Sequence, residues 1–288
     1  MKILVTSSTG LTGKAVVKAL ASKSIEVRAM IHSDIKADEM LSLGASETIV
    51  GDIASYDDLL SAMRGMDTVY YICPTAREDE AEIGKMAIKA AKETGIKRFM
   101  YQSVLHSIEP ELPHHRQKHE IERVLVNSGL IYTIVQPAPF MQNILNAKEA
   151  LVNSKVFVQK FFTRTDSVNR INLIDVGDFG SCVAEIALGT WYHFATLELC
   201  GSQNLSASEM LLEMEKVIGQ KIELKYISDD EIRKSMFERN VPEYSIETLL
   251  KMFHHYNGGD FCGSDFATST ILKRLPTTFT EFLNRELK

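Results

Sequence analysis

The sequence predicts an α/β fold with a doubly wound parallel sheet. Through the first half of the chain, short runs of β-branched residues alternate with longer runs of helical periodicity. A pair of glycines lies between the first short run and the first helical run, where α/β proteins turn from strand to helix. The 288 residues are also enough for a large core. Together these observations predict right-handed βαβ units and a sheet with helices on both faces.

The elements follow this alternation in order. In the first half we predict strands at 2–6, 26–31, 47–50, 68–72, 98–102 and 131–135, with helices at 13–21, 56–63, 80–93 and 113–127. After Pro137 the alternation loosens. There we predict strands at 156–158, 170–173, 196–200 and 222–227, and helices at 175–188, 206–218, 229–238, 245–256 and 278–288. We therefore expect a sheet domain over residues 1–136 and a smaller α+β lobe over 137–288, interleaved with the first, that covers the substrate as a lid.

Composition indicates a soluble globular protein and argues against several classes. The net charge is −6, and no run of Lys and Arg forms the basic face that nucleic acid needs. No stretch approaches about 18 apolar residues, so we expect no membrane-spanning helix. The N-terminus begins directly with a strand pattern and no secretory leader, which predicts a cytoplasmic protein. The four cysteines lack CxxC spacing and are expected to be reduced thiols: Cys73, Cys182, Cys200 and Cys262.

The stretch between the first strand and the first helix predicts a phosphate-binding loop. The start of a helix offers free N–H groups and the positive end of the helix dipole to a pyrophosphate. Gly10 would let the phosphates approach the backbone, and Gly13 would let helix and strand pack closely. The loop residues we assign to the cofactor are Ser7, Thr9, Gly10, Leu11, Thr12 and Gly13. The pattern therefore predicts a dinucleotide-binding Rossmann domain, and the alternative is a tight turn without a ligand.

The end of the second strand indicates NADP rather than NAD. NAD-preferring sites usually carry a carboxylate there for the ribose 2′-hydroxyl. Here the strand ends at His32 and Ser33, and Lys36 follows. Together with Arg28, these side chains could bind a 2′-phosphate. NAD stays possible, and the alternative is that these are solvated loop residues.

Further positions after the third and fourth strands are assigned to the cofactor site. Asp52 and Ile53 follow the third strand, where a carboxylate can accept a hydrogen bond from the adenine amino group. Asp52 could equally cap the helix that starts nearby. Cys73 and Pro74, after the fourth strand, complete the predicted cofactor contacts.

Several of these stretches together resemble the NmrA-like family of atypical short-chain dehydrogenase/reductases. They are Val5 to Gly13, Gly51-Asp52, Gly95 to Phe99 and Gln136 to Asn143. The resemblance covers about the first 150 residues well and implies a Rossmann domain with a small C-terminal lobe. Some members of the family are NADPH-dependent reductases of quinones, dyes or phenolic compounds, and others are redox sensors that bind a protein partner. Two departures are Ser7, in place of the usual first glycine, and Gln136, where the family often has Arg.

The catalytic residues of typical short-chain dehydrogenases are only partly matched. The resemblance places Ser103 at the catalytic serine and Lys118 at the lysine of a Tyr-x-x-x-Lys spacing, but His114 stands in place of the tyrosine. Three interpretations stay open: His114 is a substitute acid, or the acceptor takes its proton from water, or no chemistry occurs and Lys118 only holds the ribose. His115 and His119 lie one turn apart, yet no third ligand is evident, so we expect no metal site.

Two functions are compatible with these residues. The leading hypothesis is an NADPH-dependent oxidoreductase that transfers hydride to a small apolar conjugated acceptor such as a quinone. The alternative is a non-catalytic NAD(P)-binding redox sensor that acts through a protein partner. The substrate and the oligomeric state are left open. Aromatic residues either line the crevice or pack the core: Tyr70, Tyr71, Phe140, Phe157, Phe161 and Phe162.

Overall fold

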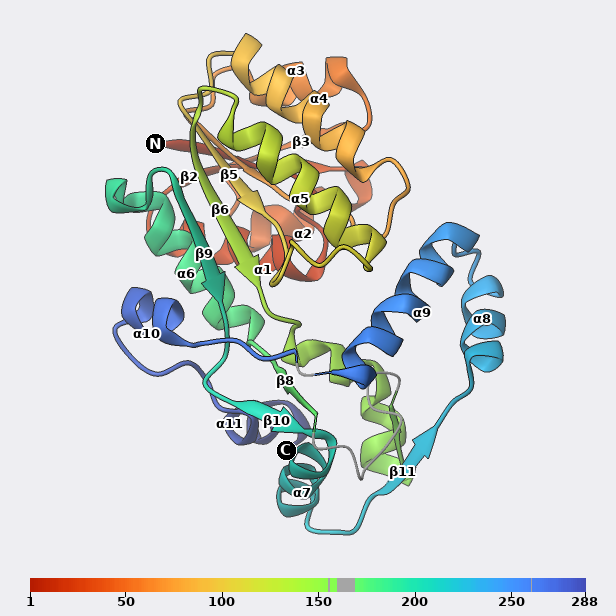
Figure 1. Ribbon diagram of the computed structural model, residues 1–288. Helices are drawn as coiled ribbons and strands as arrows, with labels where there is room; N and C mark the ends of the chain where they lie inside the picture. The colour runs from red at the N-terminus through yellow and green to blue at the C-terminus, as the bar shows by residue number, and fades with distance from the viewer. Residues whose placement is uncertain (155, 160–168, 260) are drawn as a thin grey trace.

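Seven parallel strands form the large sheet of the computed structural model, which describes residues 1–154, 156–159, 169–259 and 261–288 (Figure 1). Six strands come from the first half of the chain: β1 (Lys2–Val5), β2 (Glu26–Ile31), β3 (Glu47–Val50), β4 (Thr68–Tyr71), β5 (Arg98–Gln102) and β6 (Ile131–Pro137). The seventh, β9 (Ala195–Leu199), comes from the second half and pairs with β6. The order β3-β2-β1-β4-β5-β6-β9 confirms the predicted doubly wound fold.

Helices cover both faces of this sheet. One face carries α1 (Leu11–Ser22), α2 (Ala37–Ser42) and α6 (Val176–Leu188), and the other carries α3 (Tyr56–Met63), α4 (Glu80–Glu93) and α5 (Pro113–Val126). Within β4, Tyr70 packs into the core beside α1 and α6, whereas Tyr71 packs into the core beside α4 and α5. All four β4 residues are buried, which explains the continuous apolar run of a central parallel strand.

The remaining elements gather at the carboxyl edge of the large sheet, toward which the strand arrows point in Figure 1. Two small sheets pair distant segments: β8 (Arg170–Asn172) runs antiparallel to β10 (Asn204–Ser206), and β7 (Val156–Gln159) runs parallel to β11 (Glu223–Tyr226). The helices here are α7 (Ala207–Ile218), α8 (Asp229–Phe237), α9 (Glu243–Gly258), α10 (Phe266–Leu272) and α11 (Phe279–Leu287). Short helical turns lie at Asp34–Lys36, Met141–Ala147, Ala150–Ser154 and Thr190–Tyr192.

The structure differs from the predicted elements at several places. The prediction omits α2 and α10, of six and seven residues, because so short a helix shows little periodicity. It also omits the three-residue strand β10, and it begins the first helix at residue 13 although α1 starts at Leu11. The predicted strand at 196–200 is β9, which pairs with β6 in the large sheet, and the predicted helix at 175–188 is α6, which packs against α1.

Core packing accounts for most of the aromatic residues whose position was left open. Tyr70 and Tyr71 have no exposed surface, and Phe157 is buried as well. The ring of Phe140 lies edge-on against Phe179 of α6, with 5.2 Å between the ring centroids. Phe161 and Phe162 lie outside the described residues.

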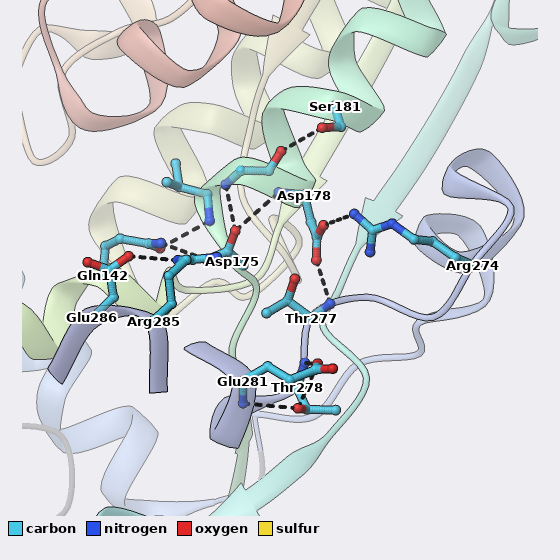
Figure 2. Close-up of polar contacts among 12 residues, drawn as sticks. Gln142, Asp175, Asp178, Ser181, Arg274, Thr277, Thr278, Glu281, Arg285 and Glu286 are labelled. Carbon is cyan, nitrogen blue, oxygen red and sulfur yellow. Dashed lines mark hydrogen bonds and ion pairs between the residues drawn. The ribbon is translucent and has the colours of Figure 1, made fainter. Parts of the chain in front are cut away.

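Two buried carboxylates at the N-terminus of α6 hold the C-terminal segment (Figure 2). Asp175 caps α6 through two backbone N–H groups and accepts hydrogen bonds from Arg285 at 2.6 Å and from Gln142 at 2.7 Å. Burial by itself would raise the pKa of Asp175, but Arg285 and Gln142 hold it below its usual value. Asp178, one turn further on, accepts from Arg274 at 2.5 Å. These contacts fix α11 and the segment after α10 against the large sheet domain.

A buried guanidinium joins the second half of the chain to the first. Arg98, at the start of β5, is 5% exposed and donates to the carbonyl oxygens of Ile186, Ala187 and Gly189 at 3.0 to 3.3 Å. It also donates to the Thr133 hydroxyl at 2.7 Å. Arg98 therefore satisfies the carbonyl oxygens of Ala187 and Gly189 at the end of α6, and it shares that of Ile186 with the Gly189 N–H. Burial lowers the pKa of Arg98 to about 10, so the guanidinium remains charged at neutral pH.

Replacing Arg98 by Met should destabilise the fold. The variant leaves the carbonyl oxygens of Ala187 and Gly189 without this donor, whereas that of Ile186 still accepts from the Gly189 N–H. Each buried carbonyl group without a donor costs about 1–3 kcal/mol. We expect the free energy of unfolding in urea to fall by about 3 kcal/mol or more. Arg123→Met removes an exposed ion pair with Glu120 and is the matched control, with an expected change below about 1 kcal/mol. Equal stability of the two variants would contradict the anchoring role of Arg98.

Candidate active site

The turn after β1 returns the chain into α1 through one left-handed residue. Ser7 has a φ of 46°, a region that glycine adopts more easily. Its hydroxyl donates to the carbonyl oxygen of Ile72 at 3.0 Å, and the Thr6 hydroxyl donates to the same oxygen at 2.8 Å. On the other side, the Ser8 hydroxyl donates to the carbonyl oxygen of Met30 at 2.7 Å. The loop is thus tied to β2 and to the end of β4, and the serine takes the conformation for which the pattern favours glycine.

The two glycines of the loop serve different purposes. At Gly13 a Cβ atom would lie 2.5 Å from the Ser7 carbonyl oxygen and 2.6 Å from the Ser8 Cα atom, so only glycine lets α1 lie this close to the turn. At Gly10 the nearest atom would be 3.5 Å away, an ordinary contact. The fold does not require glycine at position 10, and its missing side chain leaves space in front of α1.

The N-terminus of α1 is suited to an anion. Gly10 provides no side-chain cap, and the first turn contains no acidic residue. The nearest lysine on the helix, Lys14, forms an ion pair with Glu39 of α2. An uncapped helix N-terminus at the carboxyl edge of a parallel sheet offers N–H groups and a positive dipole end to phosphate. Together with the cleared space at Gly10, this arrangement fits the pyrophosphate of a dinucleotide.

The other loop residues lie around the same helix end. Thr9 is half-buried and Leu11 is 45% exposed. The Thr12 hydroxyl accepts a hydrogen bond at 3.3 Å from the side-chain amide of Gln102, which in turn accepts from the Tyr70 hydroxyl at 3.2 Å. Sequence reasoning missed Gln102, although a polar residue that ends a buried strand is a usable signal for a site at the carboxyl edge.

Three of the four side chains predicted to bind a 2′-phosphate lie at or just after the end of β2, where a ligand could reach them. His32 and Ser33 are exposed, and the Lys36 ammonium lies 3.3 Å from a carboxylate of α2. Arg28 is engaged elsewhere: it pairs with Glu47 at 2.8 Å and donates to two carbonyl oxygens at the end of α3. The suggestion that Arg28 binds the phosphate is therefore wrong, whereas the roles of the other three stay predictions.

The assignments after β3 and β4 have mixed outcomes. Asp52 does not cap α3, because Ser55 holds that position and accepts from the helix backbone, while Asp52 closes its own short turn. Asp52 is exposed at the sheet edge, and its contact with adenine stays a prediction. Ile53 is buried beneath it, and Pro74 is exposed. Burial raises the pKa of the Cys73 thiol to about 12, so this thiol remains protonated.

Lys118 lies in a buried ion pair that the sequence analysis did not foresee. Lys118, on α5, is 4% exposed, and its ammonium donates to the Glu80 carboxylate of α4 at 2.5 Å. Glu80 has no exposed surface. A signal for its burial exists, since Ile83 and Ala87 follow it at helical spacing on the buried face of α4.

His114 and His115 are both buried and neutral at pH 7. Burial lowers the pKa of His114 to about 2 and that of His115 to about 4. The Nδ1 atom of His115 lies 2.8 Å from the carbonyl oxygen of His106, so this nitrogen carries the proton. The Nδ1 atom of His114 has no hydrogen-bond partner among the described residues. An imidazole that protonates only near pH 2 is poorly matched to general-acid catalysis at neutral pH.

Ser103 lies where the sequence placed it, at the end of β5. Its N–H donates to the carbonyl oxygen of Val135 at 2.8 Å, and its buried hydroxyl has no partner in the part of the chain that the structure describes. Nearby, Gln136 and Ser107 both donate to the buried Glu122 carboxylate at 2.8 Å. Gln136 thus helps to hold the loop after β5 against α5.

The helix α9 contacts the two loops that flank Lys118, one between β4 and α4 and the other between β5 and α5. At its start, Ser245 donates to a carbonyl oxygen of the loop between β4 and α4 at 2.7 Å, and the Tyr244 hydroxyl accepts from Gln117 of α5 at 2.9 Å. Near its end, His255 lies 3.9 Å from Glu109 in the loop between β5 and α5. One helix of the second half therefore spans the two loops beside Lys118.

The described residues also bear on metal and membrane binding. They contain no group of three His, Cys, Asp or Glu side chains that could hold a metal ion. His115 faces His106, whereas the half-exposed His119 lies 3.6 Å from Glu122. Among the described helices, none combines the length and apolar character that a bilayer crossing requires.

A doubly wound sheet with a glycine loop and an uncapped helix N-terminus defines the class of dinucleotide-binding α/β proteins. Within that class, the chain belongs to the NmrA-like family, whose model matches residues 1–283. The family resemblance inferred from the first 150 residues thus extends through nearly the whole chain.

Relatives of known name include reductases. The chain is 24% identical to NAD(P)H azoreductase of Xenophilus azovorans, over 97% of this chain and 96% of the relative. It is 23% identical to quinone oxidoreductase 2 of Escherichia coli, over 96% and 95%. The NADPH complex of that quinone oxidoreductase superposes with a TM-score of 0.83, at 20% identity and 99% and 100% coverage. The negative transcriptional regulator NmrA, in complex with NADP, superposes with a TM-score of 0.79, at 16% identity and 99% and 95% coverage.

The two loop glycines should respond differently to the same substitution. In Gly10→Val the added atoms occupy only the space before α1, so the free energy of unfolding should change by less than about 1 kcal/mol, whereas NADPH binding should weaken at least about tenfold. In Gly13→Val the side chain meets the backbone of the turn, and the protein should lose about 2 kcal/mol or more of stability. Urea unfolding and nicotinamide fluorescence give the two readouts. Normal NADPH binding by a folded Gly10→Val protein would disprove the phosphate loop.

The two buried histidines should make the fold acid-sensitive. Their folded-state pKa values, about 2 and 4, lie below the unfolded value of about 6.5, so the unfolded chain takes up protons first as the pH falls. Stability is therefore complete above about pH 6.5 and is lost below it, by about 2 kcal/mol per histidine between pH 7 and pH 5. In His114→Gln this fall should shrink by about 2 kcal/mol, and the exposed His254→Gln is the control. An unchanged pH dependence in His114→Gln would contradict the burial of a neutral imidazole.

Proposed function

We propose that this chain is an NADPH-dependent oxidoreductase that transfers hydride to a small, apolar, conjugated acceptor such as a quinone. The observation that carries the proposal is the N-terminus of α1, which has no side-chain cap and has free space beside it at Gly10. The helix α5, which contains Lys118, begins at the same edge of the sheet. Membership in the NmrA-like family and similarity to an azoreductase and a quinone oxidoreductase support the same chemistry.

Separate residues of the site hold separate parts of the cofactor. The N–H groups at the start of α1 bind the pyrophosphate, and His32, Ser33 and Lys36 receive the 2′-phosphate of NADP. Lys118 holds the ribose next to the nicotinamide through its ammonium group. The bound cofactor supplies the hydride. α9, which contacts both flanking loops, excludes water from the transfer.

The proton requirement selects the class of acceptor. Reduction of a quinone takes one hydride and one proton. Hydride transfer gives a phenolate-type anion, which is a weak base and can take its proton from solvent without a positioned acid. Reduction of an ordinary ketone produces a strongly basic alkoxide and calls for a positioned acid. The imidazole of His114 is neutral and stands where related enzymes have a tyrosine, so this chain lacks that acid there. The Ser103 hydroxyl, which has no partner among the described residues, is available to donate a hydrogen bond to an acceptor oxygen.

A second function is a cofactor sensor that acts through a protein partner. The neutral His114 and the likeness to a transcriptional regulator that binds NADP favour it. The sensor would use the same loop and the same Lys118 contact, and it would differ only in having no acceptor to reduce.

Steady-state oxidation of NADPH with a panel of benzoquinones and naphthoquinones separates the two functions. We expect saturable, quinone-dependent turnover, a lower KM for NADPH than for NADH, and turnover within a few-fold of wild type in His114→Gln. A separate fluorescence titration gives the Kd of NADPH. Tight NADPH binding without turnover on any acceptor would establish the sensor instead, and an absence of NADPH binding would refute both functions.

A further inference from the structure

The ion pair between Glu80 and Lys118 differs from the surface pairs of this protein. The two side chains are 0% and 5% exposed, and 2.5 Å separates the Glu80 Oε1 atom from the Lys118 Nζ atom. The pair joins the first turn of α4 to the second turn of α5, at the carboxyl edge of the sheet. Burying two charges is expensive unless each is well paired, so a pair retained here calls for an explanation beyond stability.

The hydrogen-bonding capacity of the pair is only partly used. An ammonium group has three N–H donors, and Glu80 accepts one of them. The described residues provide no second acceptor for Lys118, and the other carboxylate oxygen of Glu80 has no partner among them either. The hydroxyl group of Tyr101, which lies near the pair on β5, is likewise unpartnered within the described chain. Two N–H donors of a fixed ammonium are therefore available for a ligand.

We propose that Glu80 is a positioning residue for the cofactor: by holding one N–H of Lys118, it aims the other two at the vicinal hydroxyl groups of the nicotinamide ribose. The inference rests on the proposed function, since it assigns a partner to the residue that holds the ribose. Two donors on one nitrogen match two hydroxyl groups on adjacent carbons. Burial raises the pKa of Glu80, and the Lys118 ammonium opposes this rise. The position of the carboxylate in the first turn of α4, near the positive end of a helix dipole, also favours its charged form.

The other titratable groups near the pair are uncharged or paired elsewhere, so Glu80 is the carboxylate that balances the charge of Lys118. Burial raises the pKa values of Tyr71 and Tyr101, and that of Cys73 to about 12, so these groups are uncharged. His114 and His115 of α5, with their lowered pKa values, are neutral at pH 7. In the loop before α4, Asp79 is paired with Arg77 at 2.8 Å.

Glu122, one turn along α5, does not replace Glu80. Its carboxylate accepts from Gln136 and Ser107. Without Glu80, the Lys118 ammonium would be buried with no paired carboxylate among the described residues, and burial without a counter-charge disfavours the charged form of a lysine.

The pH dependence of NADPH binding in Glu80→Gln tests the inference. We expect a Kd raised about threefold at pH 6.5 and more than tenfold at pH 8.5, whereas the wild-type Kd changes little across this range. Glu80→Asp keeps the carboxylate and should restore the flat pH profile at a somewhat higher Kd. Glu82→Gln removes the exposed partner of Lys85 on the same helix and is the matched control. Lys118→Met should raise the Kd at all pH values, and adding Glu80→Gln to it should raise the Kd no further.

The alternative is that the pair only fastens α4 to α5. The double variant Glu80→Met with Lys118→Met tests this, because an apolar pair can replace a buried ion pair without loss of stability. If this folded variant binds NADPH like the wild type, or if Glu80→Gln weakens binding by one factor at every pH, Glu80 is not a positioning residue. If Lys118→Met leaves the Kd unchanged, the ribose role of Lys118 is wrong and the inference fails with it. A raised Kd in Lys118→Met with no effect in Glu80→Gln overturns the inference alone.

Discussion

All seven strands of the large sheet run in the same direction, and every part of the candidate site depends on this constraint. In a parallel sheet the carboxyl ends of the strands share one edge, so the loops that follow them meet there. Gly10, Asp52 and Ser103 are far apart in the chain and come to one edge for this reason alone. The opposite edge stabilises the fold, because Arg98 at the start of β5 holds the end of α6 and so secures β9, the last strand of the sheet.

The region beneath the carboxyl edge contains polar groups that a core built only for stability would avoid. Lys118, Glu80 and His114 are almost fully buried, and the Ser103 hydroxyl has no partner among the described residues. Such groups lower the free energy of unfolding unless something binds them. Glu122, by contrast, is satisfied by Gln136 and Ser107, which shows that the same region pairs its polar groups where structure alone is served. The unpartnered Ser103 hydroxyl, at the sheet edge where α1 begins without a side-chain cap, fits a site that a ligand completes.

The sequence could predict features that depend only on neighbouring residues. The strand-to-helix turn at Gly10 and Gly13 could be located because it involves only neighbouring residues, and its phosphate-binding role stays a prediction. The pairing of Glu80 with Lys118 could not, since helical periodicity places each on a buried face but only the packing of α4 on α5 brings them together. The prediction for Arg28 was wrong because its partners are also distant in the sequence. Its guanidinium donates to carbonyl oxygens at the end of α3. Asp52 was left between two roles until Ser55 proved to be the cap of α3.

A reductase and a sensor would both depend on the contacts of α9 with the loops that flank Lys118. Ser245 and Tyr244 of α9 bind one of the loops that flank Lys118 and α5, and His255 lies beside the other loop. The position of α9 is therefore linked to both loops at the carboxyl edge of the sheet. A reductase uses such a helix to exclude water during hydride transfer. A sensor uses the same links to convert occupancy of the edge into a change on the surface of the second half, since a ligand shifts only a state to which it binds differently. What separates the functions is therefore whether an acceptor fits beneath α9, not whether the cofactor binds.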